Sequence, residues 1–275
     1  MMIIWLLTIF LPSSFVIFYL TLHFWLHDFG VPMRRDFFPK SEEKKKKIMA
    51  IFAHPDDETL VAATLAYLSP LPNTVTILLT LTKGGEGYWG KQKFAKSELK
   101  NVREEELRKT ARRLKIDKLI ILDYPDMMLY KIGKEKLKKT ILKYLKKEKP
   151  NLILTYEGNS GITGHQDHIF VSQATTEAVK EIKNQWPIRL YWTTVPGNIT
   201  RMIENAIKKK LYTPRPEFCL SFFRLGLSGL KALLQRYLAF ICHKSQFAMF
   251  RPEMGIPFWL ANLIMHRDYF YWKKV

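Results

Sequence analysis

The chain has 275 residues and a formal net charge of +19 at pH 7. Its hydrophobic content of 47% is ample for a large core, so we expect one α/β domain with an appendage. The presence of only two cysteines, Cys219 and Cys242, excludes a disulfide framework.

The first predicted element is an almost wholly apolar segment at residues 3–25. A helix of about 20 apolar residues crosses a bilayer, so residues 1–27 are predicted to be a transmembrane anchor. A cleaved signal peptide is the second interpretation, but no Lys or Arg precedes the segment and no A-x-A site follows it. A buried core helix is disfavoured by the basic tract that comes next.

A basic linker is predicted at residues 28–46, where Arg34, Arg35, Lys40 and a run of lysines follow the apolar segment. The flank richer in Lys and Arg normally stays in the cytoplasm, so we expect a single-pass membrane protein whose domain is cytoplasmic. An anionic membrane surface is the expected partner of this charge, at about 1 kcal/mol per basic residue. No nucleic acid is expected, because the sequence has no helix-turn-helix, zinc-finger or aromatic RNA-binding signature.

The sequence AHPDDE at residues 53–58 follows a predicted apolar strand at residues 48–52 and opens a predicted helix. Such a turn lies at the carboxyl edge of an α/β sheet, where ligands bind in open parallel folds. His54 and Asp57 are suited to hold a divalent metal, while Asp56 between them is suited to accept a proton from water. The alternative is that these acidic residues only cap the helix.

Strands and helices alternate through the rest of the domain, which is predicted to cover residues 47–275. Predicted strands lie at residues 75–81, 119–122, 152–155 and 189–194, and predicted helices at residues 59–68, 97–114, 135–147 and 169–182. This alternation is typical of a Rossmann-like, mostly parallel sheet with helices on both faces. Some of the lysines belong to solvated helix faces and account for part of the net charge.

A glycine-rich loop at residues 83–90 is expected at the same edge of the sheet. Its glycines allow close approach of a ligand, and Tyr88 is predicted to stack on a sugar ring, although an ordinary loop is an equal alternative. Arg103 in the next helix is predicted to hold an acidic or phosphate group of the substrate. Its alternative role is an ion pair within the helix, with Glu104 or Glu106.

A second cluster, GNSGITGHQDH at residues 158–168, also lies between a predicted strand and a predicted helix. His165 and His168 stand three residues apart around Asp167, so the cluster can supply a third metal ligand and a second group for proton transfer. A lone histidine in this position is more often a helix cap. Two such clusters at equivalent strand ends are much less expected by chance, which favours one shared site.

Taken together, AHPDDE at 53–58 and GHQDH at 164–168 resemble the LmbE-like and PIG-L-type zinc-dependent N-acetylglucosaminyl de-N-acetylases. The resemblance covers about residues 47–194, with a weaker echo at residues 243–246. It implies that the metal ligands are His54, Asp57 and His168, that Asp56 is the general base, and that His165, oriented by Asp167, is the acid or the oxyanion stabiliser.

The resemblance implies a metal-dependent hydrolase that removes the acetyl group from an N-acetylglucosaminyl conjugate, with Zn²⁺ as cofactor. The residues also allow Fe²⁺, because two histidines and one carboxylate suit non-haem iron. A lipid-linked conjugate is one candidate, since the anchor is similar to that of eukaryotic members acting on N-acetylglucosaminyl-phosphatidylinositol, whereas Asp167 is more similar to prokaryotic members. Alternatives are a membrane-tethered metal-binding protein without turnover and an amidohydrolase for a thiol-cofactor or antibiotic precursor.

The last third of the chain has an amphipathic pattern at residues 223–241. It predicts a helix that packs on the domain or lies in the membrane interface. Residues 257–272 are rich in aromatic side chains and allow the same two interpretations. The sequence leaves open whether His243 reaches the site.

Overall fold

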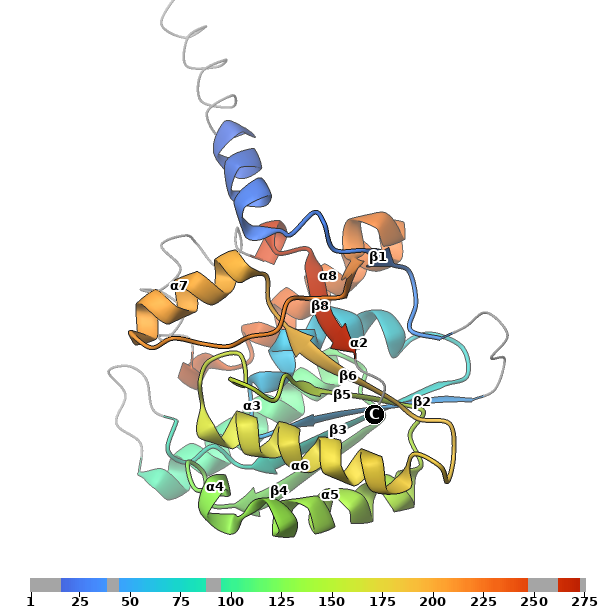
Figure 1. The fold of residues 1–275 in the computed structure, drawn as a ribbon, viewed down its shortest axis with the longest axis vertical. Coiled ribbons are helices and arrows are strands. Elements are labelled where there is room, and N and C mark those ends of the chain that lie inside the picture. The colour runs from blue at the N-terminus through green and yellow to red at the C-terminus, as the bar shows by residue number, and fades with distance from the viewer. Residues whose placement is uncertain (1–15, 39–44, 88–94, 247–261, 273–275) are drawn as a thin grey trace, which may run out of the picture.

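A mixed β-sheet forms the centre of the computed structural model, which describes residues 16–38, 45–87, 95–246 and 262–272 (Figure 1). Within these ranges the sheet has eight strands in the order β1-β7-β8-β6-β5-β2-β3-β4. They are β1 (Met33–Arg34), β2 (Lys46–Phe52), β3 (Thr74–Thr82), β4 (Lys118–Tyr124), β5 (Leu152–Tyr156), β6 (Arg189–Thr194), β7 (Phe218–Ser221) and β8 (Arg267–Trp272). From β6 to β4 all neighbours are parallel, whereas β8 is antiparallel to both β6 and β7.

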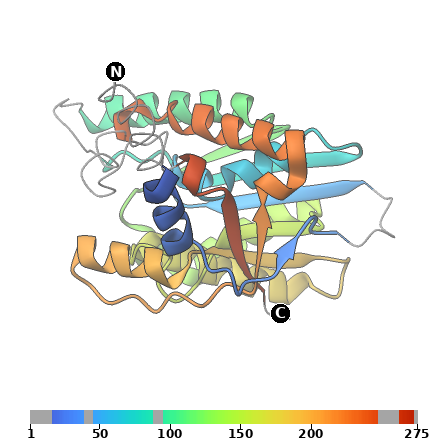
Figure 2. The same ribbon diagram turned by 90° about the horizontal axis from the view of Figure 1, so that it is seen from above.

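Helices cover both faces of the sheet, as Figure 2 shows. One face carries α2 (Ala62–Leu68), α3 (Lys96–Arg113) and α8 (Gly226–Phe240), and α8 contacts both of the others. The other face carries α5 (Lys134–Glu148) and α6 (Gln166–Ile182), which contact each other. The other labelled helical elements are η1 (Asp57–Val61), α4 (Leu129–Ile132), α7 (Gly197–Ile207), η2 (Phe222–Leu225) and η3 (Lys244–Gln246). Residues 16–26 and 262–264 are also helical. The predicted α/β class with a mostly parallel sheet is confirmed.

The order of the strands creates a switch point between β2 and β5. From β2 the chain adds β3 and β4 on one side, and it then returns to add β5 and β6 on the other side. In open α/β sheets, ligands bind outside the carboxyl ends of the strands at such a point. Both sequence motifs directly follow these two strands, so the topology brings them together.

The two strands at the switch point are apolar because both of their faces are covered. Every residue of β5 is buried, and so are residues 48–52 of β2. A parallel strand with two covered faces shows a continuous apolar run rather than alternation. These two buried strands determine where both motif-bearing loops begin.

Three strands of the described chain, β1, β7 and β8, were not predicted. β1 has two residues and β7 has four, which is too short for a periodic pattern. β8 lies in the aromatic segment at 257–272, and its Asp268 accepts hydrogen bonds from the Thr64 N–H at 2.9 Å and the Thr64 hydroxyl at 2.7 Å. Residues 267–272 therefore pack inside the sheet, while residues 257–261 lie outside the described ranges.

The predicted transmembrane anchor is described only in part, because residues 1–15 lie outside the described ranges. Residues 16–26 form a helix whose Leu26 packs with Ile264. Over the four described ranges, no helix has the length and apolar character needed to cross a membrane. The segment predicted as a linker contributes β1 and places Phe37 and Phe38 in the core.

Helix α8 lies where the amphipathic pattern predicts a helix. Its inner side packs on the domain through buried residues such as Leu233 and Phe240. Leu227 and Leu234 on its outer side are 78% and 54% exposed. Packing on the domain thus accounts for one side of the helix and leaves the outer leucines at the surface.

Candidate metal and catalytic site

The three predicted metal ligands come from the loops that follow β2 and β5. His54 and Asp57 belong to the first loop, and His168 lies in the first turn of α6. His54 Nδ1 is 3.3 Å from Asp57 Oδ2, and His168 Nε2 is 3.2 Å from Asp57 Oδ1. All three residues are buried, so the structure places the predicted donor atoms in one enclosed cluster.

The hydrogen bonds around His168 fit a cation between this ring and Asp57. His168 Nδ1 lies 3.0 Å from the Gly161 carbonyl oxygen, which only accepts, so the neutral ring carries its lone pair on Nε2. A lone pair that faces a carboxylate oxygen at 3.2 Å is repelled unless a proton or a cation lies between them. Metal-binding histidines commonly have their second nitrogen held in this way. The donor set therefore suits Zn²⁺ or Fe²⁺.

Two further carboxylates hold the second nitrogen of His54. His54 Nε2 is 3.0 Å from Asp126 Oδ1 and 3.3 Å from Asp167 Oδ2. Burial lowers the pKa of His54, but hydrogen bonds to Asp126, Asp167 and Asp57 outweigh burial and raise the pKa well above its ordinary value. Asp126 was missed by the sequence analysis, although a carboxylate shortly after β4 at this edge of the sheet is a usable signal.

His165 caps the start of α6. Its Nδ1 accepts a hydrogen bond from the backbone N–H of Asp167 at 3.2 Å, so the ring proton lies on Nε2, near the weakly accepting sulfur of Met127. Burial and the neighbouring His54 and His168 together lower the pKa of His165 to about 4. At pH 7 the ring is therefore neutral and presents an N–H donor.

Asp167 was predicted to orient His165, and it contacts that ring through its backbone N–H instead of its carboxylate. The contact with His165 uses the backbone N–H, because an N-cap side chain faces the amides of the first helical turn. The carboxylate instead lies next to His54 and accepts the Leu129 N–H at 3.0 Å. Asp167 thus places His165 through its backbone and His54 through its side chain.

Tyr156, the last residue of β5, supports two of the candidate ligands. Its hydroxyl donates to Asp57 Oδ2 and accepts the Ala53 N–H at 3.0 Å, and its ring stacks on His168 with centroids 4.2 Å apart. Burial and the nearby Asp57 raise the pKa of Tyr156 well above its ordinary value, so the hydroxyl keeps its proton. The sequence analysis counted this residue only as the end of an apolar run.

Glu157 shapes the loop that carries both histidines. This buried carboxylate accepts backbone N–H groups of Asn159 at 2.7 Å, Ser160 at 3.1 Å and Ile162 at 2.8 Å. It was also missed, although a glutamate directly after a buried strand needs partners for its charge. Its hydrogen bonds fold the loop back so that α6 begins at the site.

Asp56 has a backbone conformation that few residues adopt. Its φ of 100° and ψ of −23° lie in the left-handed region, which costs about 1–3 kcal/mol and is concentrated at functional sites. The Asp56 carbonyl accepts the Thr59 N–H at 3.0 Å, and the Asp56 N–H donates to Glu58 Oε2 at 3.0 Å. This turn allows adjacent carboxylates, those of Asp56 and Asp57, to contact different partners.

Arg103 is the partner of Asp56. Its Nη2 lies 3.0 Å from Asp56 Oδ1 and donates to the Pro55 carbonyl at 2.5 Å, while Nη1 donates to the Gly84 carbonyl at 2.9 Å. Burial raises the pKa of Asp56 by more than the Arg103 guanidinium lowers it, and the resulting pKa is about 6. Asp56 is therefore a carboxylate whose pKa lies near neutrality, as suits a general base.

The contacts of Arg103 differ from both roles expected from the sequence. Its helix neighbours have other partners, since Glu104 pairs with Lys83 at 2.8 Å and Glu106 accepts the Ser245 N–H at 2.8 Å. Arg103 is only 3% exposed and faces the Asp56 loop. The contact with substrate stays a prediction, and the structure supports Arg103 as a residue that positions Asp56.

His243, left open by the sequence, lies behind the Asp56 turn. Its Nε2 is 2.6 Å from Glu58 Oε1 and 3.0 Å from the Thr110 hydroxyl. Burial lowers the pKa of His243, but Glu58 outweighs burial and raises it. Because the other Glu58 oxygen accepts the Asp56 N–H, this buried pair helps to hold the strained turn.

The glycine-rich loop borders the site, but Tyr88 lies outside the described residues, so its stacking on a sugar stays a prediction. The Glu86 N–H donates to Asp126 Oδ2 at 2.8 Å. The Gly87 carbonyl accepts from Gln246 Nε2 at 2.6 Å. These contacts join the loop to η3 and to the carboxylate that holds His54.

The fold and the site define a doubly wound α/β protein with a candidate His–Asp–His metal site and an adjacent, largely buried carboxylate at its switch point. Residues 49–179 match the family model of PIG-L, the GlcNAc-PI de-N-acetylases. These residues, which carry both motifs and the candidate site, match the PIG-L/LmbE-like de-N-acetylases.

Two curated proteins are similar to this chain over about half of its length. The "Probable N-acetyl-alpha-D-glucosaminyl L-malate deacetylase 2" of Bacillus anthracis is 31% identical over 143 residues, which are 51% of this chain and 62% of that protein. The "Probable N-acetylglucosaminyl-phosphatidylinositol de-N-acetylase" of Schizosaccharomyces pombe is 29% identical over 141 residues, 49% of this chain and 52% of that protein. The match thus leaves more than a third of each relative uncovered.

A solved structure extends the likeness to most of the chain. The N,N'-diacetylchitobiose deacetylase from Pyrococcus horikoshii superposes with a TM-score of 0.60, covering 82% of this chain and 83% of that one. Its sequence identity is 23%, so this likeness concerns the fold.

Gly161 provides a test of how tightly the site is built. It has a φ of +57°, and a Cβ at this position would lie 2.5 Å from the Cβ of His168. We expect Gly161→Ala to lower the free energy of unfolding by about 2–5 kcal/mol, from about 1–2 for the left-handed backbone and about 1–3 for the steric overlap. Its metal content should fall as well, because His168 must move.

The matched control is Gly133→Ala, where φ is +86° but no atom lies within 4 Å of the added Cβ. The ψ of Gly133 is 143°, outside the left-handed helical region, so the alanine should cost about 1–3 kcal/mol of backbone strain without steric overlap or loss of metal. Urea unfolding and metal analysis of both variants give the measurement. Equal losses of stability, with unchanged metal content, would contradict the tight fit at His168.

Proposed function

We propose that the chain is a metal-dependent hydrolase that removes the acetyl group from an N-acetylglucosaminyl conjugate. The observation that carries this proposal is Asp56, a carboxylate only 12% exposed, which pairs with Arg103 next to the metal-ligand cluster instead of joining it. A purely structural metal site has no use for such a group. The names of both curated relatives, which state N-acetylglucosaminyl compounds, support the substrate class.

The residues fit a single divalent cation, held by His54, Asp57 and His168. When bound there, Zn²⁺ or Fe²⁺ supplies a Lewis acid that polarises the amide carbonyl and acidifies water. Asp126, Asp167 and Tyr156 keep the ligand side chains oriented through the contacts described above. Oriented ligands bind metal more tightly than free ones.

The other residues of the site handle the proton and the developing charge. Asp56 accepts a proton from water as the water oxygen bonds to the carbonyl carbon. The neutral His165 directs its Nε2 proton to the carbonyl oxygen, which becomes negative as the tetrahedral centre forms. When the C–N bond breaks, Asp56 returns its proton to the nitrogen, so acetate and the free amine leave.

Two other functions are compatible with the same cluster. One is a tethered metal-binding protein without turnover, and the other is an amidohydrolase that acts on a different acylated amine. The group attached to the sugar is not assigned. The name of one relative states an L-malate conjugate, and that of the other states a phosphatidylinositol conjugate. Incubation of the metal-loaded protein with both conjugates, followed by detection of free amine, separates these alternatives.

The metal assignment is tested by removing one ligand at a time. His54→Ala, Asp57→Ala and His168→Ala should each reduce bound metal by about one equivalent, because three protein ligands are the minimum for a stable catalytic site. Metal content is measured after dialysis against a weak chelator. Asp123→Ala, an exposed carboxylate paired with Lys100, is the control and should keep full occupancy. Full occupancy in all three ligand variants would refute the assignment.

The general base is tested by Asp56→Asn, which removes the proton acceptor but keeps the shape of the side chain. Deacetylation should fall by about 10²- to 10⁴-fold while bound metal stays unchanged. Asp123→Asn makes the same chemical change at the surface and should leave the rate alone. Near-normal turnover by the Asp56 variant would assign the role of base to another residue.

We also propose that residues 1–27 anchor the chain in a membrane with the domain on the cytoplasmic side. The apolar segment, the basic residues that follow it and the exposed Phe24 and Trp25 of the described helix support this arrangement. Protease added to intact spheroplasts should leave the domain whole until the membrane is broken. Cleavage in intact spheroplasts would reverse the orientation, and release by high salt alone would contradict the anchor.

A further inference from the structure

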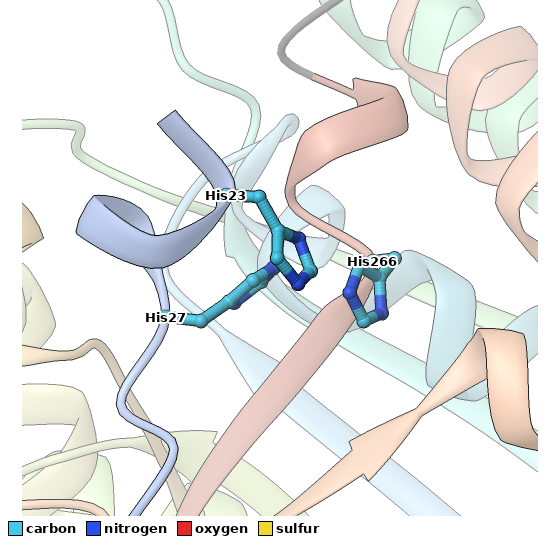
Figure 3. A group of neighbouring side chains, drawn as sticks. All are labelled: His23, His27 and His266. Carbon is cyan, nitrogen blue, oxygen red and sulfur yellow. The ribbon is translucent and has the colours of Figure 1, made fainter. Parts of the chain in front are cut away.

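Three histidines meet at the junction between the N-terminal helix and β8, outside the site described above (Figure 3). His23 lies in the helix of residues 16–26, His27 directly follows that helix, and His266 directly precedes β8. The ring centroids of His23 and His266 are 5.1 Å apart, and those of His27 and His266 are 4.6 Å apart. One ring nitrogen of each histidine lies within 4.8 Å of one nitrogen of each other histidine.

Two of these rings have a buried nitrogen without a hydrogen-bond partner. They are His23 Nδ1 and His266 Nε2. A buried polar atom without a partner costs about 1–3 kcal/mol, and such atoms are rare enough that each one requires a cause. His266 is only 3% exposed, so solvent at the surface does not satisfy its nitrogen. A ligand that accepts lone pairs from both rings removes both costs.

The third ring is oriented as a metal ligand would be. His27 Nε2 lies 2.8 Å from the Ile264 carbonyl oxygen, so it carries the ring proton and leaves the lone pair on Nδ1. That lone pair faces the Tyr269 hydroxyl at 2.9 Å, a donor that can be released. A histidine whose second nitrogen donates to a backbone carbonyl is the usual arrangement around protein-bound metals.

His266 is neutral at pH 7, which is the form of imidazole that binds metals. Burial, His27 and the Arg267 guanidinium together lower the pKa of His266 to about 3. That guanidinium lies over the Phe29 ring at 4.6 Å and opposes any added cation. Only a metal with strong affinity for imidazole can overcome that repulsion, which excludes Mg²⁺ and Ca²⁺.

We propose that His23, His27 and His266 form a second metal site, which takes one Zn²⁺, Ni²⁺ or Cu²⁺ ion and joins the N-terminal helix to β8. The helix is otherwise held by a small apolar cluster that contains Leu26 and Ile264. His266 lies 239 positions after His27, so a metal held by all three residues links the first described element to the last. This site is structural and is independent of the proposed hydrolase activity.

The test counts metal ions in the full chain, prepared without a histidine tag and stripped of metal. Zinc alone is added, and the bound zinc is measured after dialysis. The wild-type chain should hold two equivalents, His168→Ala one, His23→Phe one, and the double variant none. Phenylalanine at position 23 keeps the aromatic stacking on His266 and removes only the nitrogens, which limits damage to folding.

A second measurement uses stability in the His168→Ala background, where only the new site is left to respond. Zinc should raise the unfolding temperature of this variant and should have no effect once His23→Phe is added. Tyr19→Phe in the same helix is the matched control and should keep the response. Bound zinc that is unchanged by His23→Phe, or a His168→Ala variant that binds no zinc, would overturn the proposal. Calcium should give no shift, and a calcium shift equal to that of zinc would also overturn it.

Discussion

The carboxyl ends of β2 and β5 bury a dense set of charged groups, and the structure depends on giving every one of them a partner. An isolated buried charge costs several kcal/mol, whereas a paired and hydrogen-bonded charge is tolerated. Asp57 illustrates the solution, since burial raises its pKa, yet His168 and His54 outweigh burial and keep the pKa well below its ordinary value. Asp126 is held in the same way, because its hydrogen bonds to His54 and to the Glu86 N–H outweigh burial and keep its pKa below the ordinary value.

The pairing also separates two adjacent carboxylates into two chemical roles. Asp57 lies between two histidines, whereas Asp56, one residue earlier, faces a guanidinium. Only the left-handed backbone at Asp56 makes this divergence possible. The Thr59 N–H, which donates to the Asp56 carbonyl, and the Glu58 carboxylate, which accepts the Asp56 N–H, compensate for the local strain.

Much of this arrangement could be predicted from the sequence, because it depends on residues that directly follow recognisable strands. Apolar runs gave the central strands, and residues that directly follow parallel strands must lie at one edge of the sheet. The sequence therefore predicts that the two motifs lie together, and the family resemblance implies that His54, Asp57 and His168 are the ligands among their residues. Their close contact now agrees with that expectation.

The parts that could not be predicted depend on long-range packing. Arg103 has the helical spacing of a surface residue, and only the approach of α3 to the Asp56 turn reveals that it is buried. Asp126 reaches His54 from a strand that is not its neighbour in the sheet. β8 carries no periodic signal, because it is inserted between β6 and β7 and is buried on both faces.

The position of β8 also determines when the sheet can be completed during synthesis. Strands β2 to β6 are contiguous in the sheet and can pair as the chain emerges, since domains form from the amino terminus onward. β7 and β1, however, are connected to them only through β8, which is made from residues 267–272. The first described strand therefore pairs within the sheet only after the last one, so this edge closes only once residues 267–272 have been made. Until then, the β6 edge is unpaired and vulnerable to pairing with other chains.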